Sequence, residues 1–453
     1  MKTIPSNRKR IALLAAIVWL PSFLCAQSPL DSYVHLGLKS NLALKEKEIS
    51  LDQAKLSLDM ARSYFLPSVN VLGDYTSGKG GRNIAIPIGD LLNPVYTTLN
   101  QLTESDAFPQ VENVSQDFFP YNFYDVRVRT SVPLINTDLH INRNIEKQKV
   151  ELQQYELSAY KRQLVFDIKV AYYNYLSARE SEKIYESALQ LVEKNVQVNE
   201  SSMRNGANLP ANVLRAKSES ENVRAELNNA RVKVINARNY LNFLLNRPLD
   251  ADVDVAEDTQ YHEVDEPRSD LVAAREELAM ISKSREIQVS SLQMHKLSRM
   301  PKVNAFLDLG AQGADWEFYD RSKYFLFGVQ LSIPVFQGFR NNLAIKQSRL
   351  TLERTDMQLQ HTRGRLEVAA TMASNALSVA KQNFQAAQEQ LKSSRSYFNL
   401  VEKGFRQGVN SQIEFIDARN QLTQSELMVN LRQFEMLIAA AQLERETSSF
   451  IFN

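Results

Sequence analysis

The sequence predicts a mixed α/β membrane protein that consists mostly of long α-helices and carries four short β-strands. Three observations lead to this fold class. The chain begins with an export signal, and its two halves repeat the same landmarks in the same order. Long stretches without glycine or proline separate short segments in which apolar and polar residues alternate. The net charge of +1 gives no bulk attraction to nucleic acid.

Residues 1–26 have the composition of a secretory signal peptide. Basic residues precede the apolar run Ile11–Leu20, which is too short to cross a bilayer, and Ala26 provides a small-residue exit. We therefore expect cleavage after Ala26, with a buried N-terminal helix as the alternative. Cys25 is the only cysteine, so the cleaved chain would contain no disulfide. Lipidation of Cys25 is a second alternative, which Leu24 disfavours because a small residue normally precedes a lipidated cysteine.

An internal duplication is indicated by three matched segments. Pro67 matches Pro301, each between an expected helix and an expected strand. Further along, Ser131-Val132-Pro133-Leu134 matches Ser332-Ile333-Pro334-Val335, and Arg204-Asn205-Gly206-Ala207-Asn208 matches Arg406-Gln407-Gly408-Val409-Asn410. The sequence thus predicts a first repeat over 27–247, an acidic interrepeat linker over 248–270 and a second repeat over 271–453.

Long helices are expected between these landmarks. Residues 141–205 lack glycine and proline, which permits a continuous helix of roughly 95 Å, and residues 339–403 are interrupted only by Gly364. Apolar residues recur there at intervals of three and four, a spacing typical of coiled-coil packing. Shorter helices are expected over 42–66, 211–245, 271–296 and 409 to the C-terminus.

Alternating segments predict two β-hairpins. Val126, Val128 and Val132 alternate with polar residues, and Phe327, Val329, Leu331 and Ile333 do so in the second half. Partner strands are expected over 69–75 and 303–309. Aromatic residues precede both second strands, as in the aromatic girdles of membrane barrels, although a soluble sandwich produces the same alternation. Because four strands cannot close a barrel, and open edges are excluded from lipid, the subunit is expected to share a barrel with other copies.

The segment between the first two strands, residues 76–120, is expected to be a mobile external loop. It contains Gly78-Lys79-Gly80-Gly81-Arg82, which lacks the spacing of a phosphate-binding loop. The equivalent segment of the second half, residues 311–321, is short.

At these residues the chain resembles the TolC-like outer-membrane efflux proteins. The clearest motif is Gly328-Val329-Gln330-Leu331-Ser332-Ile333-Pro334-Val335-Phe336-Gln337-Gly338, which is similar to the strand-to-helix junction of that family. Asn41-Leu42-Ala43-Leu44, Leu244-Leu245-Asn246-Arg247-Pro248 and the two helix-to-strand prolines also fit. The resemblance implies a homotrimer with a twelve-stranded barrel in the outer membrane and a coiled-coil periplasmic tunnel. It also implies an exit duct for a periplasmic adaptor and an inner-membrane transporter, in tripartite efflux or type I secretion.

The resemblance implies that Gly206 and Gly408 mark two periplasmic tips that contact the adaptor. It places Glu414 and Asp417 where the family has rings of acids that constrict the tunnel, with two solvated surface acids as the alternative. Phe405, Asn410 and Asn212 stand where the best-known closed gate has ionisable or tyrosine side chains, which puts a salt-bridged lock in doubt. Arg204 and Arg406 are candidates for other tip bonds or for capping helix C-termini.

No catalytic constellation is found: the histidines are scattered, and no GxSxG or GxGxxG motif occurs. We therefore expect no enzyme activity, no cofactor, no metal site and no nucleic-acid partner. The alternative function is a periplasmic coiled-coil adaptor or scaffold. That class usually carries one helical hairpin, whereas this chain has two.

Overall fold

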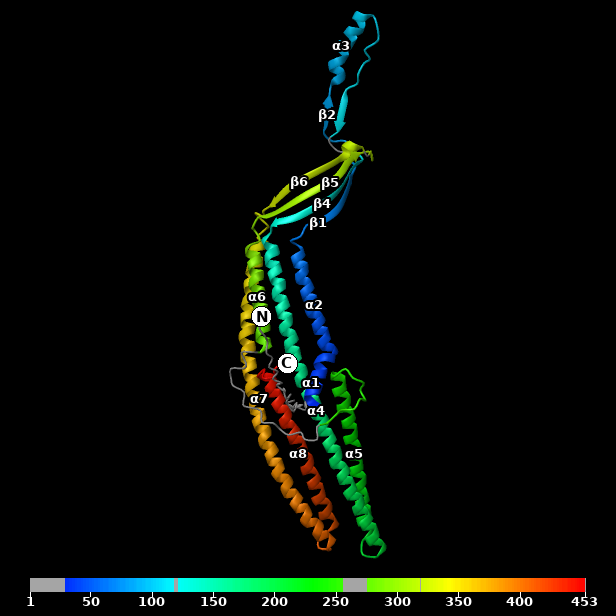
Figure 1. The fold of residues 1–453 in the computed structure, drawn as a ribbon, viewed down its shortest axis with the longest axis vertical. Helices are drawn as coiled ribbons and strands as arrows, with labels where there is room; N and C mark the ends of the chain where they lie inside the picture. The colour runs from blue at the N-terminus through cyan, green and yellow to red at the C-terminus, as the bar shows by residue number, and fades with distance from the viewer. Residues whose placement is uncertain (1–28, 118–120, 256–274, 318, 453) are drawn as a thin grey trace, which may run out of the picture. The chain divides into compact units, whose positions relative to one another are not determined.

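The computed structural model describes residues 29–117, 121–255, 275–317 and 319–452 (Figure 1). The chain divides into two compact units that share its long helices. Of the described residues, the first unit contains those within 29–41, 164–255 and 380–438, and the second contains those within 42–163, 275–379 and 439–452. The expected signal peptide, including Cys25, lies outside the described residues.

The second unit contains a four-stranded antiparallel sheet in the order β1–β4–β5–β6. Its strands are β1 (Ser68–Thr76), β4 (Phe123–Ile135), β5 (Lys302–Ala314) and β6 (Lys323–Ser332). Both expected hairpins are confirmed, since β1 pairs with β4 and β5 pairs with β6. The pairing of β4 with β5 joins the two halves of the chain in one sheet. β1 and β6 remain as its edges.

The sheet has one apolar and one polar face. Val71, Val128 and Leu309 lie opposite one another on neighbouring strands, and their side chains are 74%, 39% and 53% exposed. The adjacent row, on the other face, contains Arg129 and Asp308, which form two hydrogen bonds of 2.7 and 2.6 Å. Polar groups are thus satisfied across the strands on one face, while the other presents apolar side chains outward.

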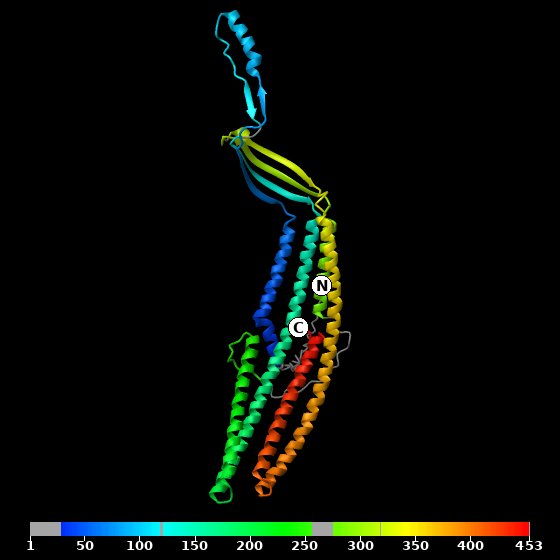
Figure 2. The same ribbon diagram turned by 180° about the vertical axis from the view of Figure 1, so that it is seen from behind.

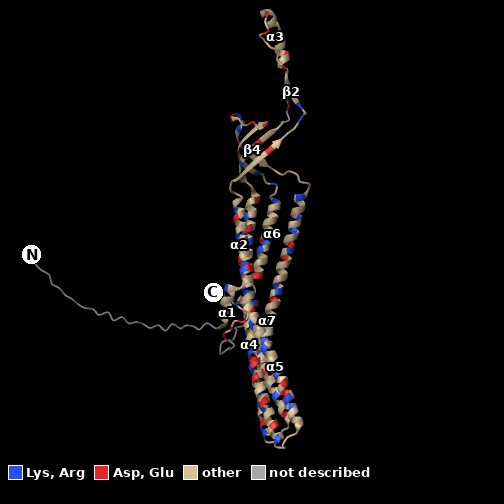
Figure 3. Cartoon of the chain, turned by 90° about the vertical axis from the view of Figure 1, so that its right-hand side faces the viewer, with Lys and Arg blue, Asp and Glu red and all other residues tan. Residues whose placement is uncertain are grey.

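The expected long helices are confirmed. In the second unit the described helices include α2 (Leu42–Ser63), α6 (Glu276–Lys296) and the first parts of α4 (Thr137–Arg204) and α7 (Arg340–Arg406). Figure 3 shows charges of both signs along the helices, in keeping with their solvated faces. Gly364 sits inside α7 without interrupting it, and a Cβ there would meet open space.

The segment 76–120, expected to be a loop, contains regular secondary structure that the sequence pattern did not predict. Its described part forms a second hairpin, β2 (Asn83–Ile86) with β3 (Val114–Asp117), which encloses the helix α3 (Ile88–Thr103). Alternation is too short in β2 and β3 to stand out from the sequence. The side chains of Asn93 and Asn100 in this helix bind backbone atoms of the returning segment, contacts that no local pattern specifies.

The first unit is made of paired helices. α4 turns into α5 (Pro210–Leu244), and α7 turns into α8 (Gln412–Glu446), and both views show each pair side by side (Figures 1 and 2). A short helix that the sequence pattern did not predict, α1 (Pro29–Ser40), joins this unit. The side chain of Ser40 donates to Leu245 O at 2.6 Å, and that of Asn41 donates to Leu244 O at 2.9 Å. Among the described residues, no helix is apolar and long enough to cross a membrane.

Candidate functional site: the two helical tips

The two tip turns have the same backbone geometry. Gly206 has a φ of +70° and Gly408 a φ of +77°, a conformation that glycine adopts without steric cost. At the first tip Gly206 N donates to Met203 O and Ala207 N donates to Ser202 O, at 3.0 and 2.9 Å. At the second tip Gly408 N donates to Phe405 O, and Val409 N donates to Gly404 O at 2.8 Å. Both turns therefore satisfy the last carbonyls of the helix in the same way.

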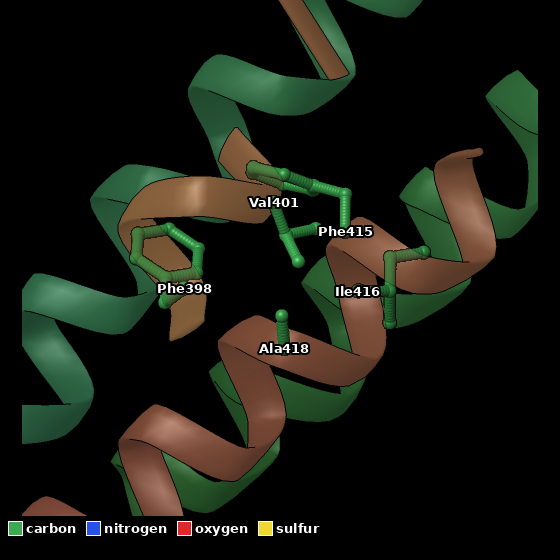
Figure 4. Close-up of a cluster of buried hydrophobic side chains, with 5 residues drawn as sticks. All are labelled: Phe398, Val401, Phe415, Ile416 and Ala418. Atoms are coloured by element: carbon green, nitrogen blue, oxygen red, sulfur yellow. The ribbon is translucent and has the colours of Figure 1, made fainter. Parts of the chain in front are cut away.

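A hydrophobic cluster supports the second tip (Figure 4). It is formed by Phe398 and Val401 of α7 with Phe415, Ile416 and Ala418 of α8, all of them buried. Phe405 stacks on Phe415, with ring centroids 4.9 Å apart. The aromatic ring expected at a tip contact thus packs within the protomer and fixes α7 against α8.

Glu414 caps the helix that contains it. Its carboxylate accepts a hydrogen bond from Ser411 N at 2.7 Å, while Glu414 N donates to Ser411 Oγ at 3.3 Å. This reciprocal arrangement is a capping box, for which the sequence Ser-x-x-Glu is the signal. The backbone amide of Ser411 lowers the pKa of Glu414, helped by the side chains of Ser411 and Asn410.

Asp417 is exposed one turn after Glu414 and, within the described residues, makes no hydrogen bond or ion pair. The two acids lie on the same side of α8 because they are three positions apart. Arg406 forms an ion pair with Glu402 at 2.6 Å, four residues earlier in α7. Arg204 is exposed in the last turn of α4. Lys217 lowers the pKa of Glu200 through a hydrogen bond and its charge, and the charge of Arg204 adds a smaller effect in the same direction. Asp417 is therefore the tip acid that the protomer itself leaves unengaged.

A network of amide side chains connects the first tip to α8. Asn212 Nδ2 donates to Asn208 Oδ1 at 2.7 Å, and Asn208 Nδ2 donates to Asn199 Oδ1 at 2.6 Å. Asn199 Nδ2 in turn donates to Gln412 Oε1 at 3.2 Å and to Asn195 O at 2.8 Å. Sequence reasoning identified only Asn212. The other members are ordinary polar residues, and only the approach of α4 to α8 brings them together.

The side chain of Asn410 lies close to Gly404 of α7. An added Cβ at Gly404 would overlap Asn410 Oδ1, so a side chain there would displace the amide of Asn410. Asn410 Nδ2 also approaches Glu414 Oε2 at 3.4 Å. Asn410 thus lies between α7 and the start of α8, as part of the second turn.

A buried ion pair joins α8 to α5. Arg419 of α8, whose side chain is 3% exposed, pairs with Glu219 of α5, which is 18% exposed. Burial lowers the pKa of Arg419, and Glu219 opposes that shift. An arginine remains protonated in such a site. The pair was not predicted, because a charged residue on a long amphipathic helix normally faces water.

The tip geometry contains no arrangement for covalent chemistry, and among the described residues no group of His, Cys, Asp and Glu is placed to hold a metal ion. What the structure builds is a pair of braced helical turns with one unengaged acid near the second.

The comparisons with known proteins agree with this geometry. Residues 34–247 and 268–447 match the family model of outer membrane efflux proteins. The CmeC outer membrane channel of Campylobacter jejuni shares 15% identity and a TM-score of 0.76, over 92% of this chain and 85% of CmeC.

A membrane protein from Pseudomonas aeruginosa has a TM-score of 0.76 at 17% identity, over 93% of this chain and 94% of its own. The open state of the MtrE outer membrane channel of Neisseria gonorrhoeae has a TM-score of 0.73 at 15% identity, over 92% of this chain and 88% of MtrE. A search of curated sequences found no match. The resemblance drawn from the motifs is confirmed, and the family is one of passive channels. The chain belongs to the outer membrane efflux protein family.

Proposed function

We propose that this efflux channel is a homotrimer in which each subunit contributes one third of a twelve-stranded outer-membrane barrel. The two edge strands of the sheet support this assembly. Among the residues that the structure describes, β1 and β6 each have one hydrogen-bonding side without a strand partner. Unpaired backbone groups are excluded from lipid, so β1 of one subunit would pair with β6 of the next.

The apolar face of the sheet supports placement in lipid. Phe325, Phe327 and Val329 of β6 are 76%, 67% and 57% exposed, so the described residues of the unit leave them largely uncovered. A water-soluble sheet would bury such a face against a second layer. The polar face, with its paired Arg129 and Asp308, would line the aqueous interior.

Exposed apolar residues on α2 and α7 support the same contact between neighbouring subunits in the helical part of the protein. On α2 the residues Leu42, Ile49 and Leu56 are spaced by seven and are 63%, 60% and 62% exposed. On α7 the residues Leu343, Leu350 and Met357 have the same spacing and are 61%, 67% and 59% exposed.

α2 leads into β1, and α7 follows β6, so pairing of the edge strands would set α2 of one subunit antiparallel to α7 of the next. Leu56 and Leu343 lie at similar distances along the chain from the sheet, which would bring Ile49 level with Leu350. A repeat of seven on both helices is the pattern of a coiled-coil seam. The seams are the observation that carries the proposed trimer.

The trimer is tested by a pair of cysteines in the α2–α7 seam. Oxidation of Ile49→Cys with Leu350→Cys should yield covalent trimers in outer-membrane fractions. Glu48→Cys with Leu350→Cys is the matched control, because Glu48 points about 100° away on α2. A monomer that remains soluble without detergent, or equal cross-linking of both pairs, would refute the assembly.

For gating, we propose that Asp417 and Glu414 of three subunits form anionic rings that favour cations at the tunnel entrance. Asp417 is the sharper test because Glu414 also caps α8. In planar bilayers Asp417→Asn should reduce cation selectivity, and Glu389→Gln, at an exposed acid of α7, should leave it unchanged. Equal selectivity in the two variants would count against the ring.

The tips are also proposed as the contact for a periplasmic adaptor, which would connect the duct to an inner-membrane transporter. A groove of about 280 Å³ lies between α4 and α7 near the second tip. Its apolar lining includes Leu191, Val198 and Phe405, and charged residues rim it. An amphipathic helix of the adaptor would fit such a groove. Val198→Asp should lower adaptor co-purification, whereas Val232→Asp, at an exposed position of α5 away from both tip turns, should not.

A further inference from the structure

The hairpin of β2, α3 and β3 is built around one face of its helix. Asn93 binds Val111 through both a donated and an accepted hydrogen bond, at 3.0 and 2.8 Å. Asn100 binds Phe108 in the same two-way manner, at 2.8 and 3.0 Å. Tyr96 lies between these amides and packs on Phe108, with ring centroids 5.8 Å apart. One face of α3 is therefore bound to the returning segment.

Close packing at the start of the helix confirms this orientation. A Cβ on Gly89 would overlap Val111 O, so the first turn of α3 lies directly against the returning chain. Asn113 Oδ1 accepts a hydrogen bond from Asp90 N at 3.1 Å. The helix is thus held in its first, second and fourth turns, and its opposite face points away from the hairpin.

The opposite face carries an apolar stripe. Ile88, Leu91, Val95 and Leu102 follow one another at intervals of three, four and seven, with Thr98 between the last two. Leu91, Val95 and Leu102 are 69%, 52% and 76% exposed. At about 100° per residue these positions centre on the side of the helix opposite Asn93, Tyr96 and Asn100. The alternation of three and four is that of a seam between helices.

We propose that the α3 helices of three subunits pack together through this stripe and form a short helical cap in the assembled channel. The proposal rests on the trimer proposed above. A threefold assembly tethers three identical stripes near one another, so each helix meets the others at a high effective concentration. The symmetry of the trimer, rather than the helix itself, then sets how many α3 helices meet and makes them parallel.

Charge argues for a second copy as the occupant instead of a lipid surface. Residues 83–117 contain five acids, Asp90, Glu104, Asp106, Glu112 and Asp117, and no lysine, arginine or histidine. Figure 3 shows α3 in the colours of acidic and uncharged residues. Helices that bind membrane surfaces carry basic residues on their polar face, because lipid headgroups are anionic. The stripe itself has no charge, so the acids do not oppose contact between copies along it.

The contact between α3 stripes is tested in the full-length protein in the outer membrane, with Cys25→Ser as background. Val95→Cys lies in the stripe, and Gln101→Cys lies on an exposed side of the same helix, about 120° from Val95 around the helix axis. On oxidation, Val95→Cys should give disulfide-linked dimers several-fold more than Gln101→Cys. A second readout uses Val95→Asp with Leu102→Asp, which should increase single-channel conductance because three charged stripes would separate.

Each result bears on the proposal separately from the trimer. Equal cross-linking at both positions would mean that the hairpins only collide, and full labelling of Val95→Cys by an impermeant maleimide without dimers would mean that the stripe is free. Labelling by a lipid-phase probe would place it in the membrane. Any of these would overturn the cap. If the seam cysteines of α2 and α7 still give covalent trimers, only the cap fails; if they do not, the proposed trimer fails as well.

Discussion

Removal of the buried cation at Arg419 should loosen the second tip. Arg419→Met keeps much of the apolar volume but leaves the carboxylate of Glu219 without its partner, and the two side chains are only 3% and 18% exposed. Breaking a buried pair by removing one partner costs about 3 kcal/mol. If α8 opens locally by that amount more easily, amide exchange over residues 412–422 should accelerate by roughly 100-fold.

The matched control is Arg395→Met. Arg395 pairs with Glu426 at 3.3 Å, but its side chain is 60% exposed, so the loss should stay below about 1 kcal/mol. The double variant Arg419→Met with Glu219→Leu removes both charges and should return exchange close to that of the wild type. Hydrogen exchange read by mass spectrometry measures all four proteins. Unchanged exchange in Arg419→Met, or no recovery in the double variant, would refute the reasoning.

Three further predictions concern the sheet and the second tip. Val329→Arg places a cation on the apolar face, at a cost of up to about 2–4 kcal/mol in mid-bilayer, and should reduce the folded outer-membrane fraction, while Gln330→Arg on the polar face should not. Gly404→Ala should accelerate exchange over the second tip, and Asn410→Ala in the same chain should reverse this, because the added Cβ overlaps that side chain. The pKa of Glu414 is lower in the folded protein than in the unfolded chain, where it is about 4.3. Its cap therefore contributes fully above the unfolded-state pKa and is lost as pH falls through the folded-state pKa. Protection of residues 411–416, corrected for intrinsic exchange, should therefore decline in acid, and Glu414→Gln should lack this step.

The helices, tip turns and strands can be predicted from the sequence because they depend on the periodicity of apolar residues and on the positions of glycine and proline. The long helices follow from the absence of glycine and proline, and the tip turns follow from Gly206 and Gly408, which take the positive φ that each turn needs. The strand pairs follow from alternation in phase about the matched prolines. The capping box at Ser411 and Glu414 also has a recognisable spacing in the sequence, whereas the family resemblance points only to a constriction at Glu414.

What the sequence by itself determined was the order and type of the main elements and, through the motifs at their junctions, the family. Only the tertiary structure decided which polar side chains meet. The amides of Asn199 and Gln412 and the ion pair of Arg419 with Glu219 join residues about 200 positions apart. The helix α3 became visible only through Asn93 and Asn100, which bind the returning backbone. Such contacts depend on where helices cross, and a hydrogen-bonding side chain carries no sign in the sequence of the partner it will reach.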